Sequence, residues 1–367
     1  MKIELNKNKV YFNNGSLKKE IHPFWLRERV DGEEFLDKGT QQRLFDPTSL
    51  DSEILINRVY INDEFLEIDF NDGVNSKLNI NKLALEFSNE DIIIKSIPKT
   101  KWDSTLKNIK NYEYQDNFFE SKEMHDLLVS FYKYGFVIIK NIPTNNNFIV
   151  KFANSIGSVR KTNFGEYFDV KSKPNPNDLA YTSLNLSPHT DNPYRNPVPC
   201  IQLLHCIENE VSGGLSTLVD GFTVTEDLKN ENLKFYKILC DVKVRFRFID
   251  KEVVLEDWSE LIKLNDDKTF KQVRFSPRMD YVPILDKEKL DLYYKARKKL
   301  SEMYNSKKYK IEFKLVSKDL MMIDNYRLLH GRTAYETKEG NRFLQGCYID
   351  YDSTEGKLRH LKRKFNL

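Results

Sequence analysis

Cysteine is scarce in this sequence. The 367 residues include four cysteines, Cys200, Cys206, Cys240 and Cys347, and no two of them form a CxxC pair. This spacing argues against a disulfide framework and against a zinc site built on paired cysteines. We therefore expect buried free thiols, which are typical of a protein in a reducing compartment.

Long apolar runs and dense basic blocks are also missing. The first residues, MKIELNKNKVYFNN, contain no apolar signal core, and no run approaches the length needed to span a bilayer. The net charge is only +3, and we expect the short basic tail LRHLKRKFNL to be a solvated end. Because phosphate binding needs a concentrated basic face, the sequence favours a cytoplasmic protein with no nucleic-acid or membrane partner.

Apolar residues are plentiful, as in a globular protein. Hydrophobic residues make up 40% of the chain and aromatic residues 13%. KIELNKNKVYF and RVYINDEFLEIDF alternate apolar and polar residues with the period of a strand. The polar, proline-containing segment SIPKTKWDSTL follows them. We predict a small β-rich N-terminal domain at residues 1–97 and a second domain at residues 98–367.

The second domain combines a few helices with many strands. Apolar spacing predicts helices in SKEMHDLLVSFYKYG, where Gly135 suits a C-cap, in NNNFIVKFANSIG with an asparagine N-cap, around residues 224–240, and in KEKLDLYYKARKKLSEMYN. Strand patterns dominate from residue 198 onward, in VPCIQLLHCI, STLVDGF, VKVRFRF, KQVRFSP, YKIEFKLV, DLMMIDN and RFLQGCYIDY. The prediction is a mainly β domain with flanking helices, arranged as a sandwich or jelly-roll barrel.

The segment LSPHTDNPY places His189 and Asp191 two residues apart. Residues at this spacing on a strand point to the same side, so both side chains could bind one metal. His330, just past the predicted strand DLMMIDN, is the candidate third ligand. Two histidines and one carboxylate are the ligand set of non-haem Fe(II) oxygenases, with the opposite face of the metal left open.

Each part of this pattern also has a simpler interpretation. The HxD pair occurs by chance in many chains, and a lone histidine is more often a core or surface residue than a ligand. His205 lies in an apolar run, and we expect it to be a hydrogen-bonded core histidine. The remaining histidines, His22, His125 and His360, carry no predicted role.

Two further residues could hold a small acid beside the metal. Arg342 lies on the next predicted strand after His330, and an arginine there could form a bidentate pair with a carboxylate co-substrate. Ser216, in the segment GGLST, could add a hydroxyl.

Taken together, two long segments resemble a known family. DLAYTSLNLSPHTDNPYRNPVPCIQLLHCIENEVSGGLSTLVDGF and DNYRLLHGRTAYE, followed by GNRFLQGCYIDYD, look like gamma-butyrobetaine hydroxylase and trimethyllysine hydroxylase, within the taurine dioxygenase-like Fe(II)/2-oxoglutarate oxygenases. The resemblance covers about residues 100 to 355. It implies a double-stranded β-helix, iron held by His189, Asp191 and His330, and 2-oxoglutarate held by Arg342 and Ser216.

The resemblance also implies a reaction and partners. O2 and 2-oxoglutarate would be consumed, succinate and CO2 released, and a C–H bond of a small molecule hydroxylated, with ascorbate as reductant. A homodimer is implied as well. One departure concerns the N-terminal domain, where many family members bind zinc through cysteines. The matching segment WLRERVDGEEFLDKGTQQR has none, so we expect no structural zinc there and a domain held together by ordinary packing.

The second departure concerns the substrate pocket. Family members hold a trimethylammonium group in an aromatic cage, and Tyr181, Phe164 and Phe168 stand at matching positions. Aromatic residues here could equally belong to the core. Phenylalanine attracts cations less strongly than tryptophan, so the ligand could be a different amine or not a cation at all.

Three other residues are candidate contacts to the remainder of a substrate. Tyr194 follows the HxD turn and could reach the far end of a ligand. Arg278, in VRFSPRMDY, and Arg195 are candidates for an anionic end, although surface ion pairs explain them equally well. We expect Arg332, two residues after His330, to brace a strand end.

The main hypothesis is therefore an Fe(II)/2-oxoglutarate hydroxylase of a small zwitterion, betaine-like in character. One alternative keeps the cofactors but changes the substrate to an aminophosphonate, a sulfonate or a free amino acid, or the outcome to desaturation. Another is a non-catalytic binding module, against which the intact ligand set and Arg342 argue. The cage-like aromatic residues favour a small ligand over a protein substrate.

Overall fold

The computed structural model describes residues 2–15, 17–87, 97–107, 109–145, 147–171 and 182–367. The chain divides into two compact units, Met1–Lys95 and Ser96–Leu367, and each is considered by itself. No helix in the described ranges is long and apolar enough to cross a membrane.

The N-terminal unit contains two three-stranded antiparallel sheets. Their strands are β1 Lys2–Asn6, β2 Lys9–Asn13 and β3 Lys18–Glu20 in one sheet, and β4 Ile56–Asn62, β5 Phe65–Phe70 and β6 Asn75–Asn79 in the other. The helical segments are α1 Pro23–Arg27, the 3₁₀ turn η1 Pro47–Ser49 and α2 Ile80–Phe87. Apolar side chains of both sheets and of α1 share one core.

Arg27 fastens the long loop of this unit. Its side chain is almost fully buried, and Nε donates to Asp72 Oδ2 over 2.7 Å. The guanidinium lies 5.5 Å from the Phe35 ring and 5.3 Å from the Phe45 ring, within cation–π range. Arg27 thus joins the loop that carries Phe35 and Phe45 to the turn between β5 and β6, in a unit whose sequence contains no cysteine.

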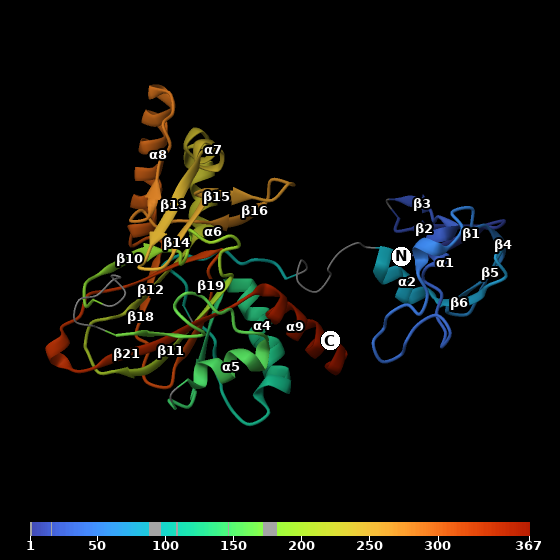
Figure 1. The fold of residues 1–367 in the computed structure, drawn as a ribbon, viewed down its shortest axis with the longest axis horizontal. Coiled ribbons are helices and arrows are strands. Elements are labelled where there is room, and N and C mark those ends of the chain that lie inside the picture. Colours follow the sequence, from blue (N-terminus) through green and yellow to red (C-terminus); the bar gives the residue numbers. More distant parts are fainter. Residues whose placement is uncertain (1, 16, 88–96, 108, 146, 172–181) are drawn as a thin grey trace. The chain divides into compact units, whose positions relative to one another are not determined.

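The larger unit is built on two sheets packed face to face (Figure 1). The six-stranded sheet has the order β7 Asn111–Glu113, β8 Phe136–Lys140, β19 Leu320–Asp324, β11 Ile201–Asn209, β21 Arg342–Ile349 and β9 Phe168–Val170. The four-stranded sheet has the order β10 Leu186–His189, β20 Leu328–Arg332, β12 Ser216–Asp220 and β18 Lys310–Phe313. Side chains from both sheets form one apolar cluster, so this unit is the predicted jelly roll.

Helices cover the outer side of the six-stranded sheet. They are the 3₁₀ turn η2 Phe118–Glu120, α4 Lys122–Tyr134, α5 Phe148–Ile156 and α9 Tyr351–Phe365. As predicted, α4 ends at Gly135, whose φ of 82° is left-handed. Asn147 precedes α5, but its side chain makes no capping hydrogen bond because its backbone is itself left-handed.

The predicted solvated tail is wrong. LRHLKRKFNL lies mostly within α9, where Leu358 and Leu361 are fully buried. Basic side chains on its other face surround Glu120, so the charges sit on one side of a packed amphipathic helix.

A further layer extends beyond the jelly roll. It contains a three-stranded sheet of β13 Lys243–Ile249, β14 Val254–Glu260 and β17 Asp280–Tyr281, and a two-stranded sheet of β15 Ile262–Leu264 and β16 Phe270–Val273. Its helices are α6 Gly221–Glu231, α7 Leu233–Asp241 and α8 Lys287–Asn305. The 3₁₀ turn η4 Thr337–Glu339 lies outside this layer, between β20 and β21. The helix predicted around residues 224–240 is in fact α6 and α7. Asn232 separates them with a non-helical backbone, and its Oδ1 accepts from Phe235 N at the start of α7.

Three cysteines, Cys200, Cys206 and Cys347, are buried, as is His205, whereas Cys240 is only half-buried. All four cysteines are free thiols, and burial raises the pKa of Cys347 to about 12, which keeps the sulfur unreactive. His205 is completely buried on β11. Burial lowers its pKa to about 4, against the opposing effect of a hydrogen bond with the Ile142 backbone, which keeps the ring neutral.

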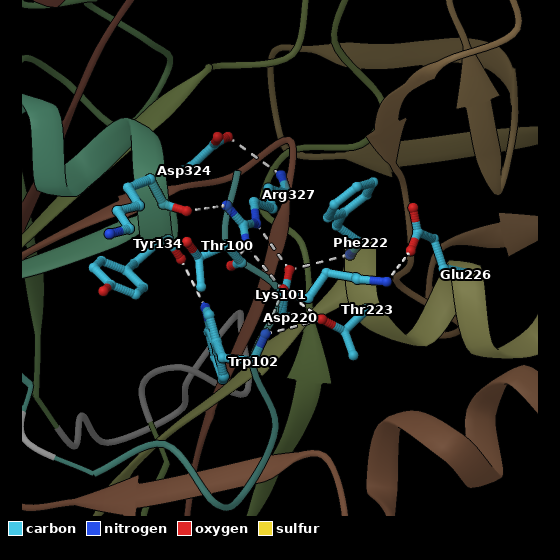
Figure 2. A network of polar contacts seen from close by, with 11 residues as sticks. Thr100, Lys101, Trp102, Tyr134, Asp220, Phe222, Thr223, Glu226, Asp324 and Arg327 are labelled. Atoms are coloured by element: carbon cyan, nitrogen blue, oxygen red, sulfur yellow. Dashed lines mark hydrogen bonds and ion pairs between the residues drawn. The ribbon is translucent and has the colours of Figure 1, made fainter. Parts of the chain in front are cut away.

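A buried ion pair joins the end of β12 to the connection between β19 and β20 (Figure 2). Asp220 ends β12 and Arg327 lies between β19 and β20, and both side chains are about 1% exposed. Arg327 Nε donates to Asp220 Oδ1 over 2.9 Å, and Nη2 donates to Oδ2 over 2.8 Å. This bidentate geometry is the strongest arrangement for such a pair.

The same pair collects backbone groups from neighbouring elements. Arg327 also donates to the carbonyls of Lys133, at the end of α4, and Thr100. Asp220 in turn caps the start of α6 by accepting from Phe222 N. The network therefore ties α4, β12, α6 and the segment before β20 together, as Figure 2 shows.

Replacing Arg327 by methionine should lower the free energy of unfolding by about 3–5 kcal/mol, because Asp220 would be left buried without its partner. Urea unfolding of the full chain measures this loss. The matched control is Lys101→Met, which removes a solvent-exposed ion pair to Glu226 at the edge of the same network. That variant should leave the unfolding midpoint nearly unchanged. Equal losses of unfolding free energy in both variants would contradict the stabilising role of the buried Asp220–Arg327 pair.

Candidate metal centre

The two candidate histidines lie directly opposite each other on adjacent strands. β10 and β20 are antiparallel, and their register pairs His189 with His330. The ring centroids are 4.6 Å apart. The sequence-based prediction placed His330 just past a strand, but it lies within β20, a strand that the pattern did not reveal.

Asp191 stands in the turn that follows β10. Asn325 fixes this turn, since its Oδ1 accepts from Asp191 N over 2.8 Å and its Nδ2 donates to Asp191 O over 3.1 Å. The carboxylate Oδ1 lies 3.4 Å from His189 Nε2 and 3.6 Å from His330 Nε2. One ligand atom from each of the three residues falls within 4.8 Å of the others, close enough to share one metal ion.

The protonation states suit a metal ligand set. His189 Nδ1 lies 2.9 Å from Ser187 O, and donation to that carbonyl leaves Nε2 as the free lone pair. Burial lowers the pKa of His330 to about 4, so its ring is neutral. Burial alone would raise the pKa of Asp191, but His330 and His189 bring it well below its usual range. Neutral imidazole and ionised carboxylate fit Fe(II).

A cavity of about 80 Å³ adjoins one side of this centre. Its polar lining beyond the ligand residues is Ser216, Arg332 and Arg342, and its apolar walls include Leu204, Met321 and Leu344. Burial, followed by the neighbouring Arg332, lowers the pKa of Arg342 to about 10. Within the described part of the chain, no carboxylate forms an ion pair with Arg342, so the cavity suits a small acid.

Local geometry holds Arg342 in this cavity. Its Nε donates to Gly214 O over 3.3 Å. Gly214 has a φ of 65°, and a Cβ there would come within 2.8 Å of Arg342 Nε, so only glycine permits this approach. Arg332 donates through Nη2 to the carbonyls of Thr182 and Leu184, which is the predicted bracing contact.

A second cavity, of about 70 Å³, adjoins the other side. Four of the residues proposed from the sequence line it: Phe164, Phe168, Tyr194 and Arg278. Tyr181 lies outside the described residues. Arg195 is not among the lining residues, and its Nη2 donates to Asn163 Oδ1 instead. Tyr194 presents a stacked ring rather than a free hydroxyl, since its OH donates to Asn192 Oδ1 and its ring lies 4.9 Å from Phe248.

Sequence reasoning missed Tyr348, which also lines this second cavity. Its ring lies 5.4 Å from that of Phe168. Tyr348 follows Arg342 by six residues on β21, an even number, so both side chains point to the same face of the strand. The two-residue period of a strand was therefore the sequence signal that could have identified Tyr348.

The family comparison matches residues 105–348 to the taurine catabolism dioxygenase TauD, TfdA family. Among curated proteins, gamma-butyrobetaine dioxygenase of Pseudomonas sp. (strain AK-1) is 28% identical, over 94% of this chain and 91% of its own. The Homo sapiens gamma-butyrobetaine dioxygenase is 31% identical, over 72% and 69%. Human mitochondrial trimethyllysine dioxygenase is 27% identical, over 92% and 82%. The resemblance inferred from the sequence is confirmed.

Solved structures share the fold of the larger unit. The crystal structure of asparagine oxygenase superposes with a TM-score of 0.50 at 11% identity, covering 66% of this chain and 93% of that one. This similarity supports the jelly-roll core and nothing about substrate.

Substituting alanine for His189, Asp191 or His330 should weaken binding of Co(II), a stable substitute for Fe(II), by more than about 100-fold, since loss of an outer-shell partner alone costs roughly 10–100-fold. Equilibrium dialysis of the full chain measures this affinity. His360→Ala is the control, because this exposed histidine lies on α9 beside Glu120. Undiminished binding in any of the three variants would remove that residue from the ligand set.

Proposed function

The chain belongs to the taurine catabolism dioxygenase TauD, TfdA family, and we propose that it uses Fe(II) and 2-oxoglutarate to hydroxylate an aliphatic C–H bond of a small, betaine-like zwitterion. The observation that carries this proposal is the cluster of His189, Asp191 and His330, flanked on one side by a cavity containing Arg342. Bound Fe(II) and 2-oxoglutarate would supply the activation of O2. The chain would supply binding, orientation and exclusion of water.

Arg342 would bind the distal carboxylate of 2-oxoglutarate. No acidic partner of this buried guanidinium lies among the described residues, so it gains most from a bidentate anion. Ser216 in the same lining could donate one further hydrogen bond. The apolar walls formed by Leu204, Met321 and Leu344 would cover the carbon chain and keep water out. Each of these roles follows from the lining of one cavity.

The second cavity would hold the substrate. Phe164, Phe168, Tyr194 and Tyr348 give it aromatic walls, which attract an alkylammonium group through cation–π contact. Arg278 is an exposed cation in the same lining, and it would face the anionic end. Relatives named for gamma-butyrobetaine and trimethyllysine support a substrate of this kind. Tyr181 remains a candidate further member of the cage.

A second candidate keeps the cofactors and changes the substrate. Phenylalanine faces attract cations less than tryptophan faces do, and Arg278 would suit a phosphonate or sulfonate as well as a carboxylate. An aminophosphonate, a sulfonate or a free amino acid therefore fits the same pocket, with desaturation as another outcome. The non-catalytic alternative would leave the ligand cluster and Arg342 without a purpose.

Two broader properties belong to the same proposal. The free thiols support a cytoplasmic location. The family resemblance supports a homodimer. Gel filtration with light scattering would establish the number of chains directly.

Purified protein with Fe(II), ascorbate and 2-oxoglutarate should form succinate faster when a quaternary amine such as gamma-butyrobetaine or trimethyllysine is added. The matching primary amines and trimethylaminoethylphosphonate are the comparison compounds, because each changes one end of the zwitterion. Stimulation by a primary amine alone would replace the betaine proposal with the amino-acid alternative. Absence of any succinate from iron-loaded protein would contradict the enzymatic assignment.

Arg342→Ala should raise the 2-oxoglutarate concentration needed for half-maximal turnover by roughly 10- to 100-fold, since a charge-assisted pair contributes about 1.5–3 kcal/mol. Titrating 2-oxoglutarate at saturating substrate measures the shift. Arg359→Ala, on the outer side of α9 beside Glu355, is the control for loss of an arginine. An unchanged requirement would mean that the co-substrate carboxylate is held elsewhere.

A further inference from the structure

The two oxygens of Asp191 have different neighbours. Oδ1 faces the Nε2 atoms of His189 and His330. Oδ2 points the other way and accepts two hydrogen bonds, one from Tyr348 OH over 2.7 Å and one from Gln202 Nε2. The carboxylate therefore enters the ligand cluster with one oxygen already engaged by the protein.

The register of the six-stranded sheet explains how both donors reach this oxygen. β11 and β21 are antiparallel neighbours, and Gln202 pairs directly with Tyr348. Directly paired residues project to the same face of a sheet, here the face that carries Arg342 and the walls of the first cavity. Gln202 and Tyr348 are 2% and 4% exposed, so water does not compete for their hydrogen bonds.

We propose that Tyr348 and Gln202 are positioning residues that restrict Asp191 to one metal-binding oxygen. The inference rests on the proposed function and concerns the number of positions left open at the metal. A carboxylate can bind a metal through one or both of its oxygens. Three protein ligand atoms leave three positions of an octahedral metal free.

Those three positions are all needed. A chelating 2-oxo acid would take two of them, and O2 would need the third. If Asp191 bound through both oxygens, the protein would occupy four positions and no site would remain for O2. The two hydrogen bonds hold Oδ2 in place, since both must be broken before that oxygen can turn toward the metal.

The contribution of Tyr348 can be separated from its place in the cavity wall. Its ring packs 5.4 Å from the Phe168 ring, with 31° between the planes, whereas only its hydroxyl touches Asp191. Tyr348→Phe removes the hydroxyl and keeps the ring. Gln202→Met removes the other donor and keeps a similar length and volume. The two variants therefore test the same oxygen from independent residues.

The experiment measures Co(II) affinity of the full chain by equilibrium dialysis and the metal geometry in crystals of the Co(II)-loaded variants. Each single variant should weaken Co(II) binding by about 10-fold, which is typical for loss of an outer-shell hydrogen bond. In the double variant, Asp191 should bind through both oxygens, and 2-oxoglutarate affinity of the Co(II)-loaded protein should fall. Tyr293→Phe is the control, because the buried hydroxyl of this α8 residue has no hydrogen-bond partner among the residues that the structure describes.

The outcomes separate this inference from the proposed function. Wild-type protein that fails to bind Co(II) would overturn the metal site itself and the positioning role with it. Wild-type binding with variants within twofold of it, or a double variant in which Oδ2 stays away from the metal, would overturn only the positioning role. Loss of affinity in Tyr293→Phe equal to that in Tyr348→Phe would also overturn it, since a buried phenol would then matter wherever it lies.

Discussion

The buried pair of Asp220 and Arg327 is the constraint on which the larger unit depends. Neither charge can remain without the other in a water-free interior, so the segments that carry them must meet. Asp220 ends the strand that begins at Ser216, and Arg327 immediately precedes the strand that contains His330. Closing this pair therefore aligns β12 and β20, whose pairing brings Leu218 opposite His330. The position of one candidate metal ligand thus follows from an ion pair outside the candidate metal centre.

Strand β21 serves the site at three separate points along one face. Arg342 lies in the first cavity, Gly346 supports a wall of the second, and Tyr348 holds Asp191. These residues are separated by even numbers, so the alternation of a strand directs them all inward. A one-residue slip of this strand would turn all three outward, which ties both cavities and the carboxylate to one register.

Much of this site was accessible from the sequence. The HxD spacing and the arginine on the following strand identify the polar residues, because metal and carboxylate chemistry restricts which side chains can serve. β20 was missed because LLHGR contains a histidine, a glycine and an arginine within five residues, and only its two neighbouring strands make it extended. Tyr348 was missed because its function depends on Asp191, a residue 157 positions away. The two buried leucines of α9 were missed for a different reason. The prediction relied on the basic composition of the tail, whereas the periodicity of a helix decides which of its residues are buried.

Gly346 determines the shape of the second cavity. The Phe168 ring occupies the space beside this residue, and a Cβ at position 346 would lie 2.4 Å from the ring. Phe168, which lines the cavity, therefore occupies the space that a side chain at position 346 of β21 would fill. Enlarging residue 346 would push Phe168 toward the cavity, and shrinking Phe168 would open it, without a change at any metal ligand. The size of this cavity can thus diverge through one pair of neighbouring positions while the three candidate metal ligands stay unchanged.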